Sequence, residues 1–292
     1  MKKSKRRKLD IVVISDVHLG TFGCRATALN NYLKTINPKI LVLNGDIIDI
    51  WQFNKRYFPK PHLKVIKQLM SFITSGTKVY YITGNHDEML RKFKGFKLGS
   101  FEIVNKIVLN IDGKKAWFFH GDVFDVTMQH SKWLAKLGGI GYDTLILINT
   151  AVNWINLKLG YDRLSFSKKI KNSVKSAVKF INDFEKTASY IAIENGYDYV
   201  VCGHIHQPEI REITNENGKT TYLNSGDWVE NLTALEYKNK TWKVYEYEND
   251  LIAKNLASDQ EIHDKELIGS EGNTSQIFEE LLAEFNINKS LK

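Results

Sequence analysis

The sequence predicts a mixed α/β fold built around parallel strands. Three short apolar runs, at residues 11–14, 40–43 and 78–82, are typical of strands buried on both faces. Amphipathic segments with helical periodicity lie between them, at about residues 25–36 and 61–75. Because strand, helix and strand alternate as in βαβ units, we expect a parallel sheet covered by helices.

The periodicity changes in the second half of the chain. Residues 101–104, 106–111 and 115–119 indicate an antiparallel edge with a hairpin, whose turn is Asp112-Gly113. Residues 127–195 contain no clear strand and include a long amphipathic helix that Gly196 ends. A strand at residues 198–202 follows, and further strands are expected near Ile210, Tyr222, Leu235 and Val244.

These elements predict one main domain with two flanking segments. Residues 1–8 form a basic arm, and residues 9–249 form the domain, which carries a helical insertion at about 126–195. Residues 250–292 form a more acidic tail, in which residues 276–284 are typical of a short helix.

Composition restricts the class of protein without selecting a function. The 292 residues include 43% hydrophobic and 25% charged residues, which is ordinary for a globular protein. The formal net charge of +8 favours anionic partners, namely phosphates, nucleic acid or acidic lipid headgroups. Two cysteines exclude a disulfide framework, and no apolar run has the length of a signal peptide core or a membrane span. We therefore expect a cytoplasmic protein.

Five polar segments, each placed directly after a predicted strand, carry the chemistry. They are Asp16-Val17-His18, Gly45-Asp46, Gly84-Asn85-His86-Asp87, His120-Gly121-Asp122 and Gly203-His204-Ile205-His206. The carboxyl ends of parallel strands lie along one edge of a sheet, so we expect these segments to meet in one crevice. Alone, each segment is more often a turn or a strand end, and only their combination indicates a site.

The residue types in these segments are typical metal ligands. Asp16 and His18 are two residues apart, as are His204 and His206, so in an extended backbone each pair points to one side and can bind one ion. A mixture of carboxylate, amide and imidazole suits two divalent ions, with Mn²⁺ favoured and Fe or Zn²⁺ as alternatives. Asp46 is the expected bridge. The seven candidate ligands are Asp16, His18, Asp46, Asn85, His120, His204 and His206.

In their order along residues 10–247, the five segments resemble the motifs of the calcineurin-like metallophosphoesterase superfamily. The resemblance implies an αββα sandwich. It also implies one metal held by Asp16, His18, Asp46 and His206, and a second held by Asp46, Asn85, His120 and His204. His86 would lie beside the scissile phosphate, with Asp87 or another carboxylate holding its ring. Two such cations would activate water as the attacking hydroxide.

Finer similarity indicates one branch of that superfamily. Residues 15–20, 45–51 and 226–228, together with the helical insertion, resemble the UDP-2,3-diacylglucosamine diphosphatases of lipid A synthesis. Members of that family cleave the pyrophosphate of a UDP-linked diacyl sugar at the α-phosphorus, typically with Mn²⁺, and release UMP and a lipid sugar phosphate. The best-known members carry Arg where this chain has His86, so the chain resembles a divergent branch.

The predicted insertion is basic and rich in aromatic residues, which indicates a lid. Between residues 126 and 186 it holds ten Lys or Arg residues against four acidic ones. Such an element suits an acyl chain and a diphosphate, and we expect salt-sensitive peripheral association with the inner face of the membrane. Four residues are candidate substrate contacts: Lys171, Asn172 and Lys175 by similarity to the family's substrate-contacting helix, and Arg25 by its position after the first motif.

Two other functions remain open at this point. A phosphodiesterase or phosphatase of the same superfamily, acting on a nucleotide or another phosphoester, agrees with the basic arm and the net charge. Nucleic acid as a partner is disfavoured, because the chain shows no RNA- or DNA-binding module. A non-catalytic scaffold should have lost metal ligands, whereas all seven candidates are present. The oligomeric state is left open.

Overall fold

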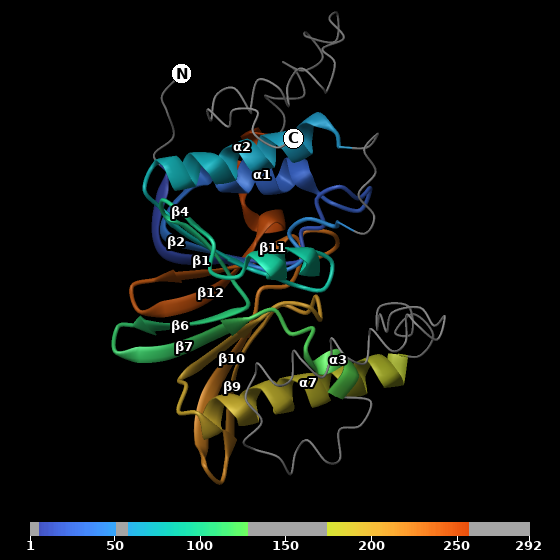
Figure 1. Ribbon diagram of the computed structural model, residues 1–292, viewed down its shortest axis with the longest axis vertical. Coiled ribbons are helices and arrows are strands. Elements are labelled where there is room, and N and C mark those ends of the chain that lie inside the picture. The colour runs from blue at the N-terminus through green and yellow to red at the C-terminus, as the bar shows by residue number, and fades with distance from the viewer. Residues whose placement is uncertain (1–5, 51–57, 128–173, 257–292) are drawn as a thin grey trace, which may run out of the picture.

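A computed structural model of the chain describes residues 6–50, 58–127 and 174–256. Two sheets pack face to face, and helices cover the outer face of each (Figure 1). Helices α1 (Ala26–Thr35) and α2 (Lys60–Thr74) lie on one outer face, and α3 (Phe124–Thr127) and α7 (Val174–Glu194) lie on the other. The predicted αββα sandwich is therefore confirmed.

The first sheet contains the βαβ units that the sequence predicts. Its order is β12-β11-β1-β2-β3-β5-β4, and β1, β2, β3 and β5 run parallel. The bounds are β1 (Arg7–Ile14), β2 (Ile36–Asn44), β3 (Lys78–Ile82), β4 (Lys97–Leu98), β5 (Phe101–Val104), β11 (Thr233–Lys238) and β12 (Thr241–Glu246). The 3-10 helix η1 (Glu88–Phe93) lies between β3 and β4, and η3 (Tyr247–Asn249) follows β12.

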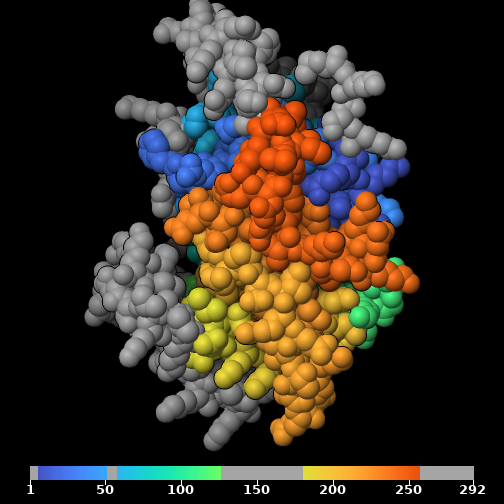
Figure 2. Space-filling view, turned by 180° about the vertical axis from the view of Figure 1, so that it is seen from behind, coloured from blue at the N-terminus to red at the C-terminus, as the bar shows by residue number. Residues whose placement is uncertain are grey.

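The second sheet has the order β6-β7-β8-β10-β9. Its bounds are β6 (Lys106–Ile111), β7 (Lys114–Phe119), β8 (Tyr199–Cys202), β9 (Glu209–Asn215) and β10 (Gly218–Asn224). Strands β7, β8 and β10 are parallel, while β6 and β9 pair antiparallel at the two edges. Seen from behind in Figure 2, the strands from β9 to β12 occupy much of the molecular face.

Strand alternation explains how the layers hold together. In β1, Val12 and Ile14 pack into the core beneath α1 and α2, whereas Ile11 and Val13 pack into the core between the two sheets. Successive side chains of a strand point to opposite faces, so an uninterrupted apolar run can fill both cores at once. A third core lies between the second sheet and α7, where Phe184 is fully buried.

One predicted pairing is wrong. The hairpin of β6 and β7, with its turn at Asp112-Gly113, is confirmed, and both turn residues have positive φ. However, β5 belongs to the first sheet, where it pairs parallel with β3 and antiparallel only with the two-residue β4. The chain changes sheets between Val104 and Lys106, and the alternation of residue types carries no signal for that change.

Several expectations concern the ends and the insertion. Strand β1 begins at Arg7, inside the predicted arm of residues 1–8, because the backbone of Arg7 pairs with Ile36 of β2. The Arg7 side chain also donates to Glu236 of β11 at 2.9 Å. Most of the predicted lid, residues 128–173, lies outside the described residues, as do residues 1–5 and the predicted helix at 276–284. Among the helices of the described ranges, none has the length and hydropathy needed to cross a membrane.

Candidate metal centre

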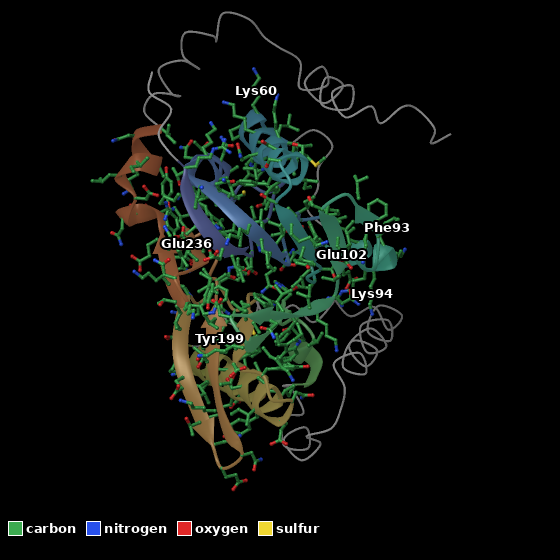
Figure 3. The ribbon with its side chains drawn as sticks, turned by 90° about the vertical axis from the view of Figure 1, so that its left-hand side faces the viewer. Lys60, Phe93, Lys94, Glu102, Tyr199 and Glu236 are labelled. Carbon is green, nitrogen blue, oxygen red and sulfur yellow. The ribbon has the colours of Figure 1, made fainter. Side chains whose placement is uncertain are left out.

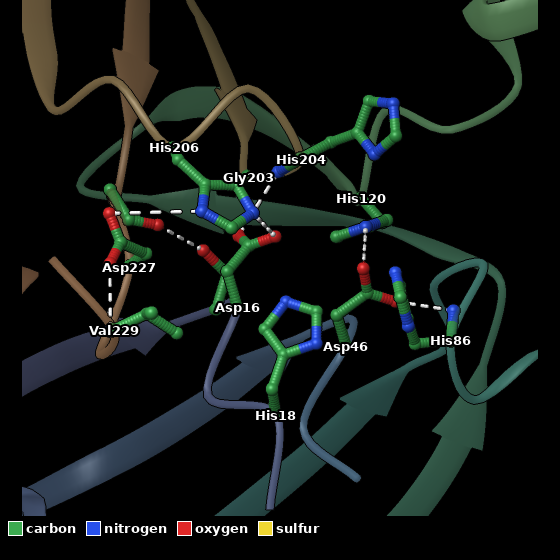
Figure 4. Close-up of polar contacts among 12 residues, drawn as sticks. Asp16, His18, Asp46, His86, His120, Gly203, His204, His206, Asp227 and Val229 are labelled. Carbon is green, nitrogen blue, oxygen red and sulfur yellow. Dashed lines mark hydrogen bonds and ion pairs between the residues drawn. The ribbon is translucent and has the colours of Figure 1, made fainter. Parts of the chain in front are cut away.

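The five polar segments meet where the two sheets come together. The ends of β1, β2 and β3 bring Asp16, Asp46 and His86 from the first sheet (Figure 4). The ends of β7 and β8 bring His120 and His204 from the second sheet. The expected convergence is therefore present, but at a junction between two sheets rather than along the edge of one.

Hydrogen bonds between the segments fix this junction. The backbone amides of Asp16 and His18 donate to the carbonyls of Gly45 and Asp46, at 3.1 and 2.9 Å. The carboxylates connect segments further apart, since Asp46 Oδ1 accepts from the amide of His86 at 2.8 Å and Asp16 Oδ2 accepts from the amide of His204 at 3.0 Å. Each carboxylate therefore keeps one oxygen anchored and presents the other to the site.

Two glycines are required by close approach rather than by a sharp turn. A Cβ atom at Gly203 would lie 2.6 Å from Asp16 Oδ2, and a Cβ atom at Gly84 would collide with Asp46 Oδ1. Carbon and oxygen atoms in van der Waals contact are much further apart. A side chain at either position would displace a candidate metal ligand.

The backbone of the site is strained. Nine non-glycine residues in the described ranges have positive φ, and five of them are candidate ligands: Asp16, His18, Asp46, His204 and His206. Such conformations are uncommon for non-glycine residues and concentrate at functional sites. The expectation that the Asp-x-His and His-x-His segments are extended is wrong, because the chain turns at each of these ligands.

Potential ligand atoms gather in three overlapping groups within which all atoms lie within 4.8 Å of one another. The groups are Asp16 with His18 and His206, His18 with Asp46 and His86, and Asp46 with His120 and His204. His204 and His206 therefore lie in different groups, and the expectation from alternation that they bind one ion together is wrong. Asp46 and His18 each belong to two groups, and Asp46, as a carboxylate with two oxygens, is the one suited to bridge two ions.

The electrostatics of the site favour a cation. Burial opposes ionisation of Asp46, yet His120, His18 and His86 bring its pKa well below the usual range. Burial likewise acts against the Asp16 carboxylate, but His206 and His120 lower its pKa to about 2. Burial acts to lower the pKa of His206, whereas Asp16 raises it to about 9. Carboxylates that attract protons to their histidines attract a metal ion by the same field.

The described residues also leave suitable donor atoms available. Asp16 Oδ1 and His120 Nε2 are buried and make no hydrogen bond of good geometry within the described ranges. The nearest charged partner of Asp16 Oδ1 is His206 Nε2 at 3.2 Å, and that of His120 Nε2 is Asp46 Oδ2, also at 3.2 Å. His120 Nδ1 lies 2.8 Å from the carbonyl of Asn44 and donates there, so Nε2 is the ring nitrogen that faces Asp46 and that a metal ion could take in place of a proton. The donor set therefore fits a divalent metal ion.

Asn85 and His86 follow β3 and are both half-buried. His86 Nδ1 lies 2.9 Å from Asp49 Oδ2, so Asp49, rather than Asp87, holds the ring. Within the described residues, the hydrogen bonds of the Asp87 carboxylate go to the amides of Ile47 and Gly84 and to the hydroxyl of Tyr81. Burial raises the pKa of Asp87 to about 6. Asp87 thus fixes the loop geometry instead of contacting the His86 ring.

The geometry and the comparisons with known proteins agree. The sequence profile of the calcineurin-like phosphoesterases matches residues 9–208, which include all seven candidate ligands. This chain belongs to that family. It is a metal-dependent phosphoester hydrolase, and the Asp and His groups described above are the residues able to bind the metal.

Curated relatives cover most of this phosphoesterase. A UDP-2,3-diacylglucosamine hydrolase of Aliivibrio fischeri is 21% identical over 82% of this chain and 99% of that protein. A protein of the same name from Blochmanniella pennsylvanica is 26% identical over 70% of this chain and 82% of that protein. Among solved structures, an archaeal phosphodiesterase is 14% identical, with a TM-score of 0.40 over 81% of this chain and 98% of that chain. Family membership rests on the profile match.

Two further carboxylates of this phosphoesterase hold the histidines from behind, and sequence reasoning gave them no role. Asp125 Oδ1 lies 2.5 Å from His204 Nε2, and Asp227 Oδ2 lies 3.9 Å from His206 Nδ1. Asp227 Oδ1 also accepts backbone amides, those of Val229 and Glu230 at 2.7 and 2.5 Å. A carboxylate hydrogen-bonded to a ligand histidine, as Asp125 is to His204, fixes the orientation of the ring, whereas Asp227 faces His206 only at ion-pair distance. A signal was present for Asp227, which lies in the 226–228 segment, whereas Asp125 lies three residues beyond Asp122.

The candidate substrate contacts are only partly described. Arg25 is exposed, and its amide donates to the carbonyl of Trp228, whose own amide donates to the carbonyl of Asp16. Arg25 therefore lies two hydrogen bonds away from the metal centre. Lys171 and Asn172 lie outside the described residues, and Lys175 is placed in α7 without a described side chain.

Proposed function

We propose that this phosphoesterase cleaves the pyrophosphate of a UDP-linked diacyl sugar, UDP-2,3-diacylglucosamine, to UMP and a lipid sugar phosphate. The supporting observation is that relatives with that name align over most of their length, 99% in one case, and that the six Asp and His candidate ligands of this chain gather in three overlapping groups. The proposal places the enzyme in lipid A synthesis.

The proposed ligands form two sets that share Asp46. One set is Asp16, His18, Asp46 and His206, and the other is Asp46, Asn85, His120 and His204. Bound there, two divalent ions, with Mn²⁺ favoured, would supply Lewis acidity and an activated water for attack on phosphorus. The protein orients the ligands through its cross-segment hydrogen bonds and excludes bulk solvent, since Asp16 and His120 are fully buried.

His86 is the proposed proton donor. Its Nδ1 donates to Asp49, so Nε2 is the nitrogen left to face a phosphate oxygen. Burial acts to lower the pKa of His86, but the hydrogen bond to Asp49 and the nearby Asp46 raise it overall. The protonated ring is thereby favoured, and it can donate to negative charge that develops on the substrate.

One residue keeps a second function open. The best-known diacylglucosamine diphosphatases carry Arg at the position of His86, and a permanently charged guanidinium differs from a titratable imidazole in both reach and chemistry. A phosphodiesterase or phosphatase acting on a nucleotide or a simpler phosphoester agrees with His86 at this position.

A product assay separates the two functions. Metal-replete full-length protein is given UDP-2,3-diacylglucosamine in detergent micelles and, in parallel, bis(p-nitrophenyl) phosphate, and UMP and p-nitrophenol are measured. We expect UMP release that a chelator abolishes and that Mn²⁺ restores. Turnover of the diester without any UMP would replace the proposed substrate with a simple phosphoester. A matched control is Asp10→Asn, which alters a surface carboxylate paired with Lys39 and should leave UMP release unchanged.

The proposed substrate also sets the location of the enzyme. A diacyl sugar resides in a bilayer, and a UDP-linked substrate is made and used in the cytoplasm. We therefore propose that the protein acts in the cytoplasm at the inner face of the membrane. The proposed lid at about residues 126–195 would cover the acyl chains.

A further inference from the structure

The segment that follows the His86 motif carries apolar and basic side chains exposed together. Between β3 and β5 the chain forms η1 and β4, and residues 92–99 are all exposed. Phe93, Phe96 and Leu98 expose 57%, 50% and 54% of their surface. Lys92, Lys94 and Lys97 alternate with them along the chain. We call these six residues the η1–β4 surface.

This exposure is imposed by an ordered backbone. The amide of Gly95 donates to the carbonyl of Ile103 at 2.8 Å, and the amide of Ile103 donates back to the carbonyl of Phe96 at 3.0 Å. Gly95 and Gly99 have φ of +86° and +56°, which turns the segment sharply. The backbone is therefore fixed against β5, while the rings of Phe93 and Phe96 remain directed away from the cores.

The charge of the surface has one sign. Residues 89–99 contain no acidic side chain. Lys97 forms an ion pair with Glu102 at 3.3 Å, and Arg91 forms one with Asp122 at 2.5 Å. In the part of the chain that the structure describes, Lys92 and Lys94 form no ion pair, so their charge is available to an external anion.

From this combination we propose that the η1–β4 surface docks the enzyme on an anionic lipid bilayer. Exposed aromatic and aliphatic side chains enter the headgroup region, and lysines beside them contact anionic headgroups, which is the known pattern of interfacial binding. The inference rests on the proposed function, because a diacyl substrate must be reached in a bilayer. It names the element that brings the site to that substrate.

The chain and the hydrogen bonds of Arg91 connect the η1–β4 surface to the metal centre. Helix η1 begins directly after Asp87, and Arg91 in η1 donates both to Asp122, which follows His120, and to the carbonyl of Gly84. In Figure 3, Phe93 and Lys94 lie at one side of the molecule, opposite Glu236 of β11. Docking through η1 would therefore hold the metal centre close to the membrane while the β11 side faces the cytoplasm.

Vesicle binding by variants of the full-length protein tests the proposal. We compare sedimentation with phosphatidylcholine vesicles with and without phosphatidylglycerol, at low and high salt. Each lysine near an anionic surface contributes about a fivefold factor to partitioning, so Lys92→Gln/Lys94→Gln should lower it by more than about tenfold. Phe93→Ser/Phe96→Ser should lower partitioning at least as strongly. The matched control Leu251→Ser/Ile252→Ser removes exposed apolar side chains near Glu236 and should bind as wild type does.

Activity assays separate failure of docking from failure of the proposed function. The η1–β4 variants should release UMP at the wild-type rate from substrate in micelles and more slowly from substrate in vesicles. Equal vesicle binding by wild type and both variants overturns the docking proposal even if UMP is released. Binding of single-stranded RNA or self-association through these six residues, without vesicle binding, also overturns it. Vesicle binding without UMP release overturns the proposed substrate and leaves docking supported.

Discussion

The two sheets contribute differently to the metal centre. The first sheet supplies the carboxylates Asp16 and Asp46, which are 0% and 2% exposed and each accept a backbone amide from another segment. The second sheet supplies the histidines His120, His204 and His206, and the His206 side chain is 39% exposed. The histidines are oriented mainly by other groups, among them Asp125 and the carbonyl of Asn44.

This difference shows how a site between two layers keeps its shape. A charged ligand from one sheet is held by an amide from a distant segment, so neither sheet can shift without breaking hydrogen bonds at the site. Asp16 is the clearest case, because its carboxylate accepts from the amide of His204 across the junction. We therefore expect the carboxylates to determine whether the site exists, and the histidines to tune each half of it.

The largest expected effect concerns the shared carboxylate. Replacing Asp46 by Ala removes a ligand from both proposed sets and the acceptor of the His86 amide. Loss of a group that only orients a ligand costs about 10–100-fold, so loss of the shared ligand should lower turnover by more than about 100-fold. Steady-state UMP release and metal content by elemental analysis measure the effect.

If Asp46→Ala keeps near-normal turnover and close to two metal ions per chain, the carboxylates of the first sheet do not determine whether the site exists. Far-ultraviolet circular dichroism tests whether a loss of turnover or of metal is caused by unfolding of the variant. Asp10→Ala, in the same sheet and paired at the surface with Lys39, serves as the matched variant and should keep both metal ions.

A smaller and more selective effect is expected from the histidines. His204 and His206 lie in different groups, so His206→Ala should weaken the set with Asp16 and leave the set with His120, whereas His204→Ala should do the reverse. Each variant should retain one tightly bound Mn²⁺ ion instead of two. Calorimetric titration of metal-free protein with Mn²⁺ checks the stoichiometry, and loss of both ions in each variant would show that the groups are not independent.

The sequence predicted the fold better than it predicted the arrangement of the candidate ligands. Apolar runs define β1, β2 and β3, and a motif directly after a strand places its side chains at that strand's end, so the position of a residue such as Asp46 at the end of β2 follows from the sequence. The junction between two sheets could not be found in this way. The alternation of apolar and polar residues indicates which face of a strand is buried, but it does not indicate to which sheet the strand belongs, as β5 shows.

The roles of carboxylates were also beyond sequence reasoning. Asp87 and Asp49 both lie within a motif, yet only contacts show that Asp87 joins Ile47 to Gly84 while Asp49 holds His86. Likewise, the separation of His204 from His206 depends on positive φ values that extended-strand reasoning excludes. Strained backbone at a site is the case in which local rules are expected to fail.

The smallest expected effect tests whether the second sheet's histidines depend on support from behind. Asp125→Asn keeps the size of the side chain but removes the charge facing His204 Nε2, so Mn²⁺ affinity at the His204 group should fall by about 10–100-fold. Asp125→Glu should recover part of this affinity. Asp198→Asn, at the opposite end of β8, is the matched control, because Asp198 is exposed and bonds the amide of Lys115. If Asp125→Asn lowers the melting temperature of metal-free protein but leaves Mn²⁺ affinity unchanged, Asp125 supports the fold rather than the ligand, and His204 does not depend on this carboxylate for its position.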